Sequence, residues 1–432
     1  MKEIFFIVIS FFIMTMCFGQ KKQTFISTDI NNFWTAYEKI ISTNDTVQQY
    51  KFLRELYIEK GTMGLSNLIE IRNYSDKSFL DAIKKYPEFW SSIKANTLAV
   101  KDQYPAIESD IEKLRVVYPA LKHSTIYFLI GVFRTGGTTK EDRVLIGSEL
   151  SLADKSTRID ELPQWRQPFY KENALIESLP LLCTHEYVHT QQKEIVHNLL
   201  SKCLYEGVAE FVSCKATGKK SNVPAIEFGR ANQEIVLNQY VKDLFIISNS
   251  NNWMWGENRN DLKIRDLGYY IGYEISERYY NLSKNKTKAI KELIELDYTN
   301  EKEVERIIDK VKFLPKTIRE LNIDYEKQRP TIILISPFKN GSKNVKSGIT
   351  KITVTFSEPL SRNNTGVDFG PLGEIAFPKL KPERVWSADG KTWTIEADLK
   401  PYQHYQILIS NNFRKVDGVR LKPFLIDFKT TE

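Results

Sequence analysis

Apolar side chains recur at helical spacing over most of the first three quarters of the chain. Between residues 27 and 322, aromatic and aliphatic side chains return every three or four positions, as in Phe33, Trp34 and Tyr37, with polar positions between them. This periodicity is that of amphipathic helices with one face toward a core. It predicts a mainly α-helical domain over residues 20–327.

Two apolar, β-rich runs interrupt the helical pattern. They are Ser124–Phe133 and Arg143–Leu152, and the segment between them, Arg134–Thr139, has the composition of a turn. Short apolar runs bounded by Gly and Thr are typical of strands. We therefore expect a small β-sheet or hairpin within the helical domain.

After Asp324 the pattern changes to short strands separated by turns. The expected strands are Thr331–Ser336, Gly348–Phe356, Arg384–Trp386, Thr392–Ala397, Tyr405–Ser410 and Phe424–Lys429. Asp389-Gly390 lies between two of these runs and is a strong hairpin signal. Residues 328–432 are thus predicted to form an all-β sandwich, and the chain to be multidomain.

The first residues carry a targeting pattern. Ile4–Met16 is an apolar run that follows a short charged start, and it is too short to cross a bilayer as a helix. We expect a signal peptide over residues 1–19, a mature chain that starts at Gln20, and export to the periplasm or beyond the cell. Acylation of Cys17 is the less favoured alternative, because Met16 is large for a lipoprotein signal.

Composition narrows the class of protein. The 432 residues include 61 Lys and Arg and 54 Asp and Glu, a net charge of +7, with 42% hydrophobic and 27% charged residues. These fractions exclude a disordered chain and a polytopic membrane protein. The basic residues alternate with acidic ones, which indicates a solvated surface and not a nucleic-acid site. Beyond the signal, Cys183, Cys203 and Cys214 are too few for a disulfide framework, and at least one thiol stays free.

One motif carries clear chemistry. His185-Glu186-Tyr187-Val188-His189 is an H-E-x-x-H sequence within a helical pattern. Side chains four positions apart share one helix face, so both imidazoles can reach a single zinc ion. Glu186 then lies beside the open coordination position, where a base can take a proton from water that the metal activates.

Two histidines do not complete a zinc site, so a third ligand is required. Glu206 and Glu210 lie one turn apart in the next helical segment, and we choose Glu206 as the ligand, with Glu210 accepting a hydrogen bond from an imidazole. His197 is the rival ligand, although it follows His189 closely. Gly207 is expected to let this segment approach the motif helix.

The motif and its surroundings resemble a known class. H-E-x-x-H followed by Glu206-Gly207-Val208-Ala209 resembles the gluzincin class of zinc metallopeptidases, and residues 30–325 are similar to a family of bacterial predicted zinc-dependent proteases of that class. The resemblance implies Zn²⁺ held by His185, His189 and Glu206. It also implies that Tyr269, which precedes Gly272 in a Y-x-x-G pattern, stabilises the transition state, with Tyr273 as the alternative.

The peptidase resemblance also implies a mode of substrate binding, and the C-terminal residues carry a separate resemblance of their own. Such peptidases add an extended substrate to the edge of a small sheet, for which Arg143–Leu152 is the candidate edge. Residues 330–432 look like a bacterial Ig-like domain of the SbsA type, as in Ile352–Leu360 and Trp386–Thr394. Such domains are spacers or binding modules, which suggests a partner in the cell envelope.

Together these features predict an exported zinc metallopeptidase that acts on a peptide or protein substrate. Its catalytic residues would be Glu186, as general base, and Tyr269. The alternative is a non-catalytic envelope or adhesion protein, in which the metal site is structural or vestigial and the Ig-like domain binds a partner.

Overall fold

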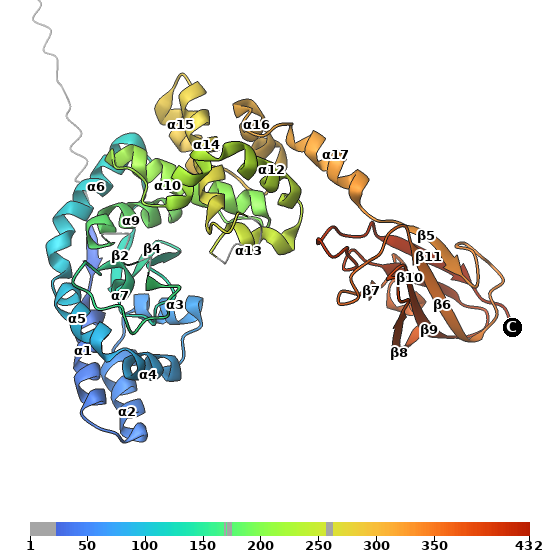
Figure 1. The fold of residues 1–432 in the computed structure, drawn as a ribbon, viewed down its shortest axis with the longest axis horizontal. Helices are drawn as coiled ribbons and strands as arrows, with labels where there is room; N and C mark the ends of the chain where they lie inside the picture. Colours follow the sequence, from blue (N-terminus) through green and yellow to red (C-terminus); the bar gives the residue numbers. More distant parts are fainter. Residues whose placement is uncertain (1–22, 168–169, 171–174, 256–261) are drawn as a thin grey trace, which may run out of the picture. The chain divides into compact units, whose positions relative to one another are not determined.

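A computed structural model describes residues 23–167, 170, 175–255 and 262–432, and divides them into two compact units that meet in sequence at Gln191 and Gln192 (Figure 1). The predicted signal peptide, residues 1–19, lies outside the described residues. Among those described, no helix is long and apolar enough to cross a membrane. The split falls within the predicted helical domain, 20–327, and the predicted domain boundaries stay predictions.

The first unit combines helices with one small sheet. Its helices and single turns are α1 (Thr28–Ile41), α2 (Thr46–Leu53), η1 (Arg54–Ile58), α3 (Met63–Arg72), α4 (Asp76–Lys85), α5 (Pro87–Leu98), η2 (Val100–Gln103), α6 (Tyr104–Val117), α7 (Ser148–Ser151) and α9 (Leu175–His189). Their apolar faces form an aromatic core in which Phe33, Trp34 and Trp90 are buried against one another. The helical periodicity of the sequence is accounted for by this core.

The sheet confirms a strand in each of the two expected runs, but both strands are shorter than predicted and their topology differs. Its order is β1 (Thr24–Ile26), β2 (Thr125–Leu129), β4 (Arg143–Gly147) and β3 (Gly137–Lys140). β2 and β4 are parallel neighbours, so they are not the two arms of a hairpin. The hairpin instead joins β3 to β4, because the segment predicted as a turn contains a strand of its own.

The same topology shows that the predicted substrate edge is wrong. β4 pairs with β2 on one side and β3 on the other, and its C-terminal continuation is the helix α7. Residues 143–152 therefore offer no free edge. Among the described strands, the outer position on this side belongs to β3.

Two helices cover opposite faces of this sheet. α3 lies against Tyr127 of β2, because a Cβ atom on Gly64 would come within 2.4 Å of the Tyr127 ring. α9 lies against Gly137 of β3, where a Cβ atom would come within 2.5 Å of Glu186. In the strand register Tyr127 aligns with Leu145 and Thr138, so Gly137 faces the other side. α9 thus packs on the face of the sheet opposite to α3, at the β3 edge.

The second unit starts with helices and ends with strands. Its helices and turns are α10 (Leu199–Thr217), α11 (Pro224–Ala231), α12 (Gln233–Asp243), η3 (Ile247–Asn249), α13 (Ser250–Trp253), α14 (Leu267–Leu282), α15 (Lys286–Ile294), α16 (Glu301–Val311) and α17 (Ile318–Gln328). α14 is central, since it packs on α10, α11, α15 and α16. This confirms a mainly helical chain as far as Gln328.

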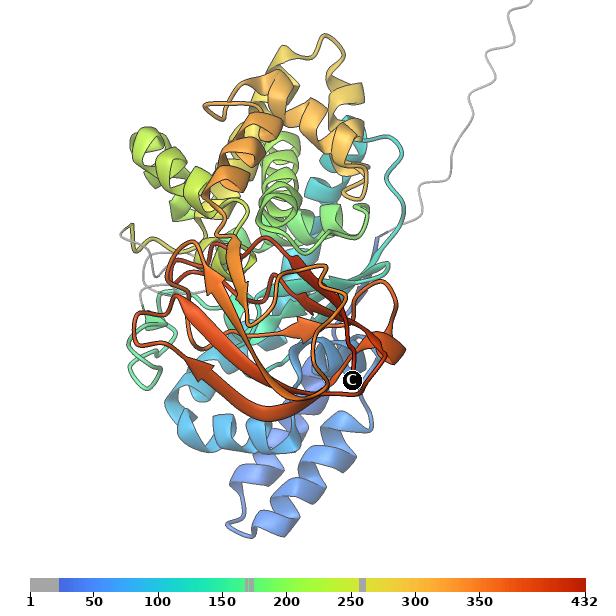
Figure 2. The same cartoon turned by 90° about the vertical axis from the view of Figure 1, so that its right-hand side faces the viewer.

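Strands follow α17, as the sequence predicts. They are β5 (Ile332–Ser336), β6 (Gly348–Phe356), β7 (Val367–Asp368), β8 (Lys379–Trp386), β9 (Thr392–Leu399), β10 (His404–Ile409) and β11 (Phe424–Lys429), with a short turn η4 (Glu374–Ala376) (Figure 2). They form the sheets β5-β6-β9-β8 and β11-β10-β7. One buried cluster holds side chains of both sheets, among them Ile352, Trp393 and Ile407. The two-residue strand β7 was not predicted.

Candidate metal centre

The helix that carries the H-E-x-x-H motif begins earlier than its composition suggests. Proline is commonest in the first turn of a helix, yet Pro180 lies inside α9, whose described part starts at Leu175. Because proline has no backbone N–H, α9 lacks one of its backbone hydrogen bonds at this position. The helix continues past it, and its next turn is held by a hydrogen bond that Thr184 Oγ1 donates to the Pro180 carbonyl at 2.8 Å.

The two motif histidines face the same point. Their Nε2 atoms are 3.0 Å apart, the ring centroids 4.7 Å apart, and the ring planes nearly perpendicular at 85°. Donors of a tetrahedral zinc site with bonds of about 2.0–2.1 Å lie about 3.4 Å from each other. The imidazole pair therefore has nearly the spacing that one shared ion requires.

Glu206 completes a group of three possible ligands. Ligand atoms of His185, His189 and Glu206 all lie within 4.8 Å of one another, and all three residues are buried, with 6–7% of their surface exposed. Two neutral imidazoles and one carboxylate are a donor set that zinc uses in catalytic sites. A bound cation would also stabilise the buried carboxylate beside the two imidazoles, because it would neutralise the negative charge. The residues present thus fit a metal ion.

The two alternatives for the third ligand are not part of this group. His197 is exposed, in the segment between α9 and α10. Glu210 is buried one turn beyond Glu206, and accepts a hydrogen bond from the Cys214 thiol at 3.7 Å. The bond predicted from a histidine to Glu210 stays a prediction.

Glu186, the expected base, packs directly on the sheet edge. The position of Gly137 in β3 brings the strand backbone against the Glu186 carboxylate, with no space for a side chain between them. Glu186 is buried, with 7% of its surface exposed. Gly137 is the first residue of β3, the outer strand among those described, so the carboxylate lies beside the start of that strand.

Gly207 has a different neighbour from the one predicted. It was expected to bring α10 close to the motif helix, but it meets α14 instead. A Cβ atom on Gly207 would lie 2.1 Å from the carbonyl carbon of Gly272, and one on Gly272 would lie 1.8 Å from the Cys203 carbonyl oxygen. The two glycines let the backbones of α10 and α14 touch. This contact holds the helix with Glu206 against the helix with Tyr269.

The structure distinguishes the two candidate tyrosines. Tyr269 has side-chain hydrogen bonds with Glu206 and with Trp255, and burial, followed by the negative charge of Glu206, raises the pKa of Tyr269 well above its usual value. The Tyr269 hydroxyl therefore belongs to the group around the possible metal ligands.

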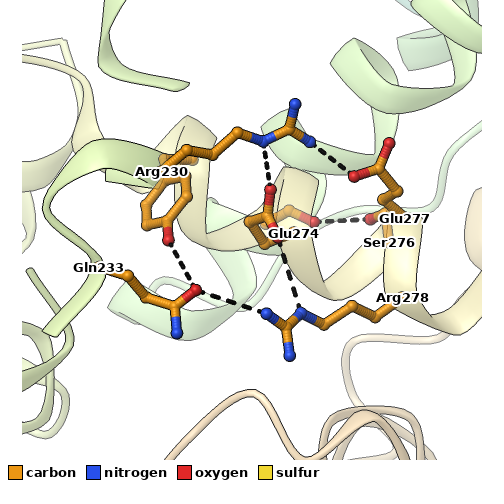
Figure 3. A network of polar contacts seen from close by, with 8 residues as sticks. Arg230, Gln233, Glu274, Ser276, Glu277 and Arg278 are labelled. Carbon is orange, nitrogen blue, oxygen red and sulfur yellow. Dashed lines mark hydrogen bonds and ion pairs between the residues drawn. The ribbon is translucent and has the colours of Figure 1, made fainter. Parts of the chain in front are cut away.

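Tyr273 lies in different surroundings. Its ring packs edge-on against Phe211 and under the guanidinium of Arg230. Arg230 is held in turn by Glu274 and Glu277, each at 2.6 Å, and Glu274 also pairs with Arg278 (Figure 3). These ion pairs tie α14 to α11. Tyr270, the third tyrosine, points to α11, where its ring lies against Gly229.

Two further aromatic residues, Trp255 and Tyr298, belong to the surroundings of Glu206 and Tyr269 but were not predicted from the sequence. Trp255 bonds to Tyr269, and its backbone N–H donates to Asp266 at 2.7 Å. Tyr298 is buried close enough to Glu206 for that charge to contribute to raising the Tyr298 pKa. Neither residue has a motif of its own. Both lie in segments between helices, where isolated aromatic residues are common, so the sequence does not mark them as part of a site.

The three cysteines behave as apolar core residues. Cys183, Cys203 and Cys214 are all free and buried, which settles the open question of pairing among the described thiols. Burial raises the pKa of Cys203 to about 12 and that of Cys183 well above its usual value, so both thiols stay protonated.

Comparison with known proteins supports the metal site. Residues 168–300 match a family described as "Predicted Zn-dependent protease (DUF2268)", a region that includes all three possible ligands. No curated protein matches the chain.

Two solved structures are weakly similar to this chain. CopC from Methylosinus trichosporium OB3b is 13% identical with a TM-score of 0.19, covering 24% of this chain and 94% of that one. The S-layer protein rSbsC(31-844) is 12% identical with a TM-score of 0.18, covering 94% of this chain and 45% of that one. Neither similarity defines a function for this chain.

Proposed function

We propose that this protein is an exported zinc metallopeptidase. The main support for this proposal is the buried group of His185, His189 and Glu206, whose ligand atoms lie within 4.8 Å of one another. The match of residues 168–300 to a zinc-dependent protease family supports the same assignment. Export is proposed from the apolar run Ile4–Met16 alone.

The proposed chemistry assigns one role to each residue. A zinc ion, when bound, supplies a Lewis acid that acidifies water and polarises a carbonyl group. Glu186 takes a proton from the attacking water and then gives it to the leaving amine. Tyr269 donates a hydrogen bond to the oxygen that becomes negative in the transition state. His185, His189 and Glu206 would hold the ion.

The substrate is proposed to lie along β3. Among the described strands, β3 pairs with β4 alone, and Gly137 at its start touches Glu186. An extended peptide that pairs with the outer edge of β3 through main-chain hydrogen bonds would bring its backbone toward Glu186. This assignment replaces Arg143–Leu152, which lies inside the sheet.

The strands after Gln328 are proposed to be an Ig-like module that acts as a spacer or binds an envelope partner. The supporting observation is that two sheets, β5-β6-β9-β8 and β11-β10-β7, share one buried core. A non-catalytic adhesion protein with a structural metal is the second candidate function, and the same module would serve it.

A peptide library separates the two functions. Purified mature protein is incubated with the library and products are identified by mass spectrometry, before chelation, after chelation and after zinc is returned. The peptidase proposal predicts cleavage that stops on chelation and recovers with zinc. One zinc ion per chain without cleavage of any peptide would favour the adhesion protein.

A further inference from the structure

The first unit contains a cavity that the proposed chemistry does not use. It lies between α4, the segment that follows β2, and residues 162–166, and has a volume of about 300 Å³. The side chains that matter for its chemistry are Lys85, Tyr86, Phe133, Arg134, Trp165 and Arg166. They are three cations and three aromatic rings, a combination that suits an anionic group.

Arg166 forms one wall together with two rings. Its guanidinium carbon lies 4.6 Å from the centroid of the Trp165 ring and 5.7 Å from that of Phe133. The Trp165 side chain nevertheless has 63% of its surface exposed. A large aromatic ring that stays exposed while it orients an arginine is typical of a binding surface.

The charges of the cavity do not cancel. Lys85 lies 5.3 Å from the centroid of the Tyr86 ring, while Arg134 and Arg166 donate to backbone carbonyls. The acidic residue of the lining, Asp81, is paired with Lys77 at 2.6 Å. Buried Glu149 lies outside the lining, but its charge interacts with that of Arg166. The three cations still outnumber Asp81 and Glu149, so the cavity presents a positive potential and a carboxylate is the complementary ligand.

The wall next to the sheet is fixed in place. Phe133 has a left-handed backbone with φ of 63°, an uncommon conformation for a residue with a side chain. Buried Glu149 holds it there, because the carboxylate accepts hydrogen bonds from the backbone N–H groups of Gly131 and Phe133 at 2.9 and 3.0 Å. Backbone strain that the surrounding structure maintains is often found at binding sites.

The cavity is connected by backbone to the proposed substrate edge. The chain runs from Phe133 in the cavity wall to Gly137, the first residue of β3, which touches Glu186. Four residues span at most about 14 Å when extended. A peptide paired along β3 would therefore pass the cavity about three or four residues from the bond that is hydrolysed beside Glu186.

We propose that this cavity is a specificity subsite for an acidic side chain of the peptide substrate, three to four residues from the scissile bond. The assignment rests on the proposed function for the position of that bond, but not for the binding itself. Lys85 and Arg166 bind the carboxylate, and Tyr86 and Trp165 contact its aliphatic part.

Binding to the full-length Glu186→Gln protein tests the subsite. The probes are fluorescent peptides, blocked at both ends, in which one Glu or Gln occupies each position of an otherwise neutral sequence in turn. We expect one position at which Glu binds about tenfold more tightly than Gln. Lys85→Gln and Arg166→Gln should remove this preference. Lys84→Gln, a change of the adjacent exposed lysine outside the cavity, is the matched control and should keep it.

Two results would overturn the subsite: a preference for Glu that is equal at all positions, or one that survives both Lys85→Gln and Arg166→Gln. Lys85 makes no backbone hydrogen bond in the described structure, so Lys85→Gln remains informative if Arg166→Gln fails to fold. Because binding needs no cleavage, absence of peptidase activity would refute the proposed function and leave this test intact.

Discussion

Gly207 of α10 and Gly272 of α14 face each other with no side chain between them. A Cβ atom on Gly207 would lie 2.1 Å from the carbonyl carbon of Gly272. The contact aligns two helices whose functional side chains, Glu206 and Tyr269, share a hydrogen bond. Spacing between the possible metal ligand and the tyrosine thus depends on two residues that have no functional group.

Substituting Gly272 by Ala is predicted to destabilise the protein by about 2–3 kcal/mol. The new methyl group would meet the Cys203 carbonyl oxygen at 1.8 Å, so the two backbones must separate. Urea unfolding followed by tryptophan fluorescence measures the change. Gly136→Ala is the control, because its nearest neighbour would lie 3.8 Å away. Equal stability of the two variants would contradict the packing described for α10 and α14.

Glu149 is predicted to give the first unit a distinct pH dependence. Burial raises the pKa of the Glu149 carboxyl above its usual value of 4.5, against the effect of the hydrogen bonds from Gly131 and Phe133. A raised pKa means that the folded state holds the proton more tightly. The stability from this group is then complete below the unfolded pKa, and is lost as the pH rises through the folded pKa.

The comparison with Glu149→Gln isolates this effect. The free energy of unfolding of the wild type, minus that of the variant, should fall as the pH is raised from about 4.5. Urea unfolding at several pH values measures both proteins. A difference that stays constant or rises with pH would show that Glu149 is not buried as described.

His189→Ala is predicted to lose bound zinc, with affinity reduced at least about 100-fold. The imidazole is one of three donors in the buried group, and the remaining two cannot hold the ion as tightly. Metal content by mass spectrometry is the measurement. His197→Ala provides the control, since His197 is exposed and outside the group, and it should keep one zinc per chain. The reverse pattern would make His197 the ligand.

Tyr269→Phe is predicted to lower kcat about 10²–10³-fold, the usual cost of removing one hydrogen-bond donor to a developing oxyanion. Tyr273→Phe should change kcat little, because its ring lies against Phe211 and Arg230. Zinc content is measured for both variants, since Tyr269 also bonds to Glu206. Similar losses in the two variants would leave the distinction between the tyrosines unsupported.

The features that the sequence predicts best are local ones. The spacing of His185 and His189 fixes their common helix face, and the Asp389-Gly390 turn joins β8 to β9 as expected. The alternation of helical and strand patterns likewise predicts the change after Gln328. Each of these depends on residues a few positions apart, where helix and strand geometry alone determine the outcome.

The features that the sequence predicts poorly depend on distant partners. Nothing in Arg143–Gly147 reveals that β2 lies beside it, and this pairing makes β3 the outer strand. Tyr269 and Tyr273 are one turn apart on the same helix, so only the packing of α14 on α10 distinguishes them. Gly207 likewise indicates that α10 approaches another helix closely, but the residues around it in the sequence do not reveal that this helix is α14.

Glu186→Gln separates metal binding from catalysis in this site. The change keeps the size of the side chain and removes its ability to take a proton, and Glu186 is not among the three grouped ligands. Zinc content and cleavage of a peptide library are measured on wild type and variant under the same conditions. We expect one zinc ion per chain in both proteins and a loss of cleavage of about 10²–10⁴-fold in the variant. A variant that holds zinc and cleaves peptides as fast as the wild type would contradict this expectation.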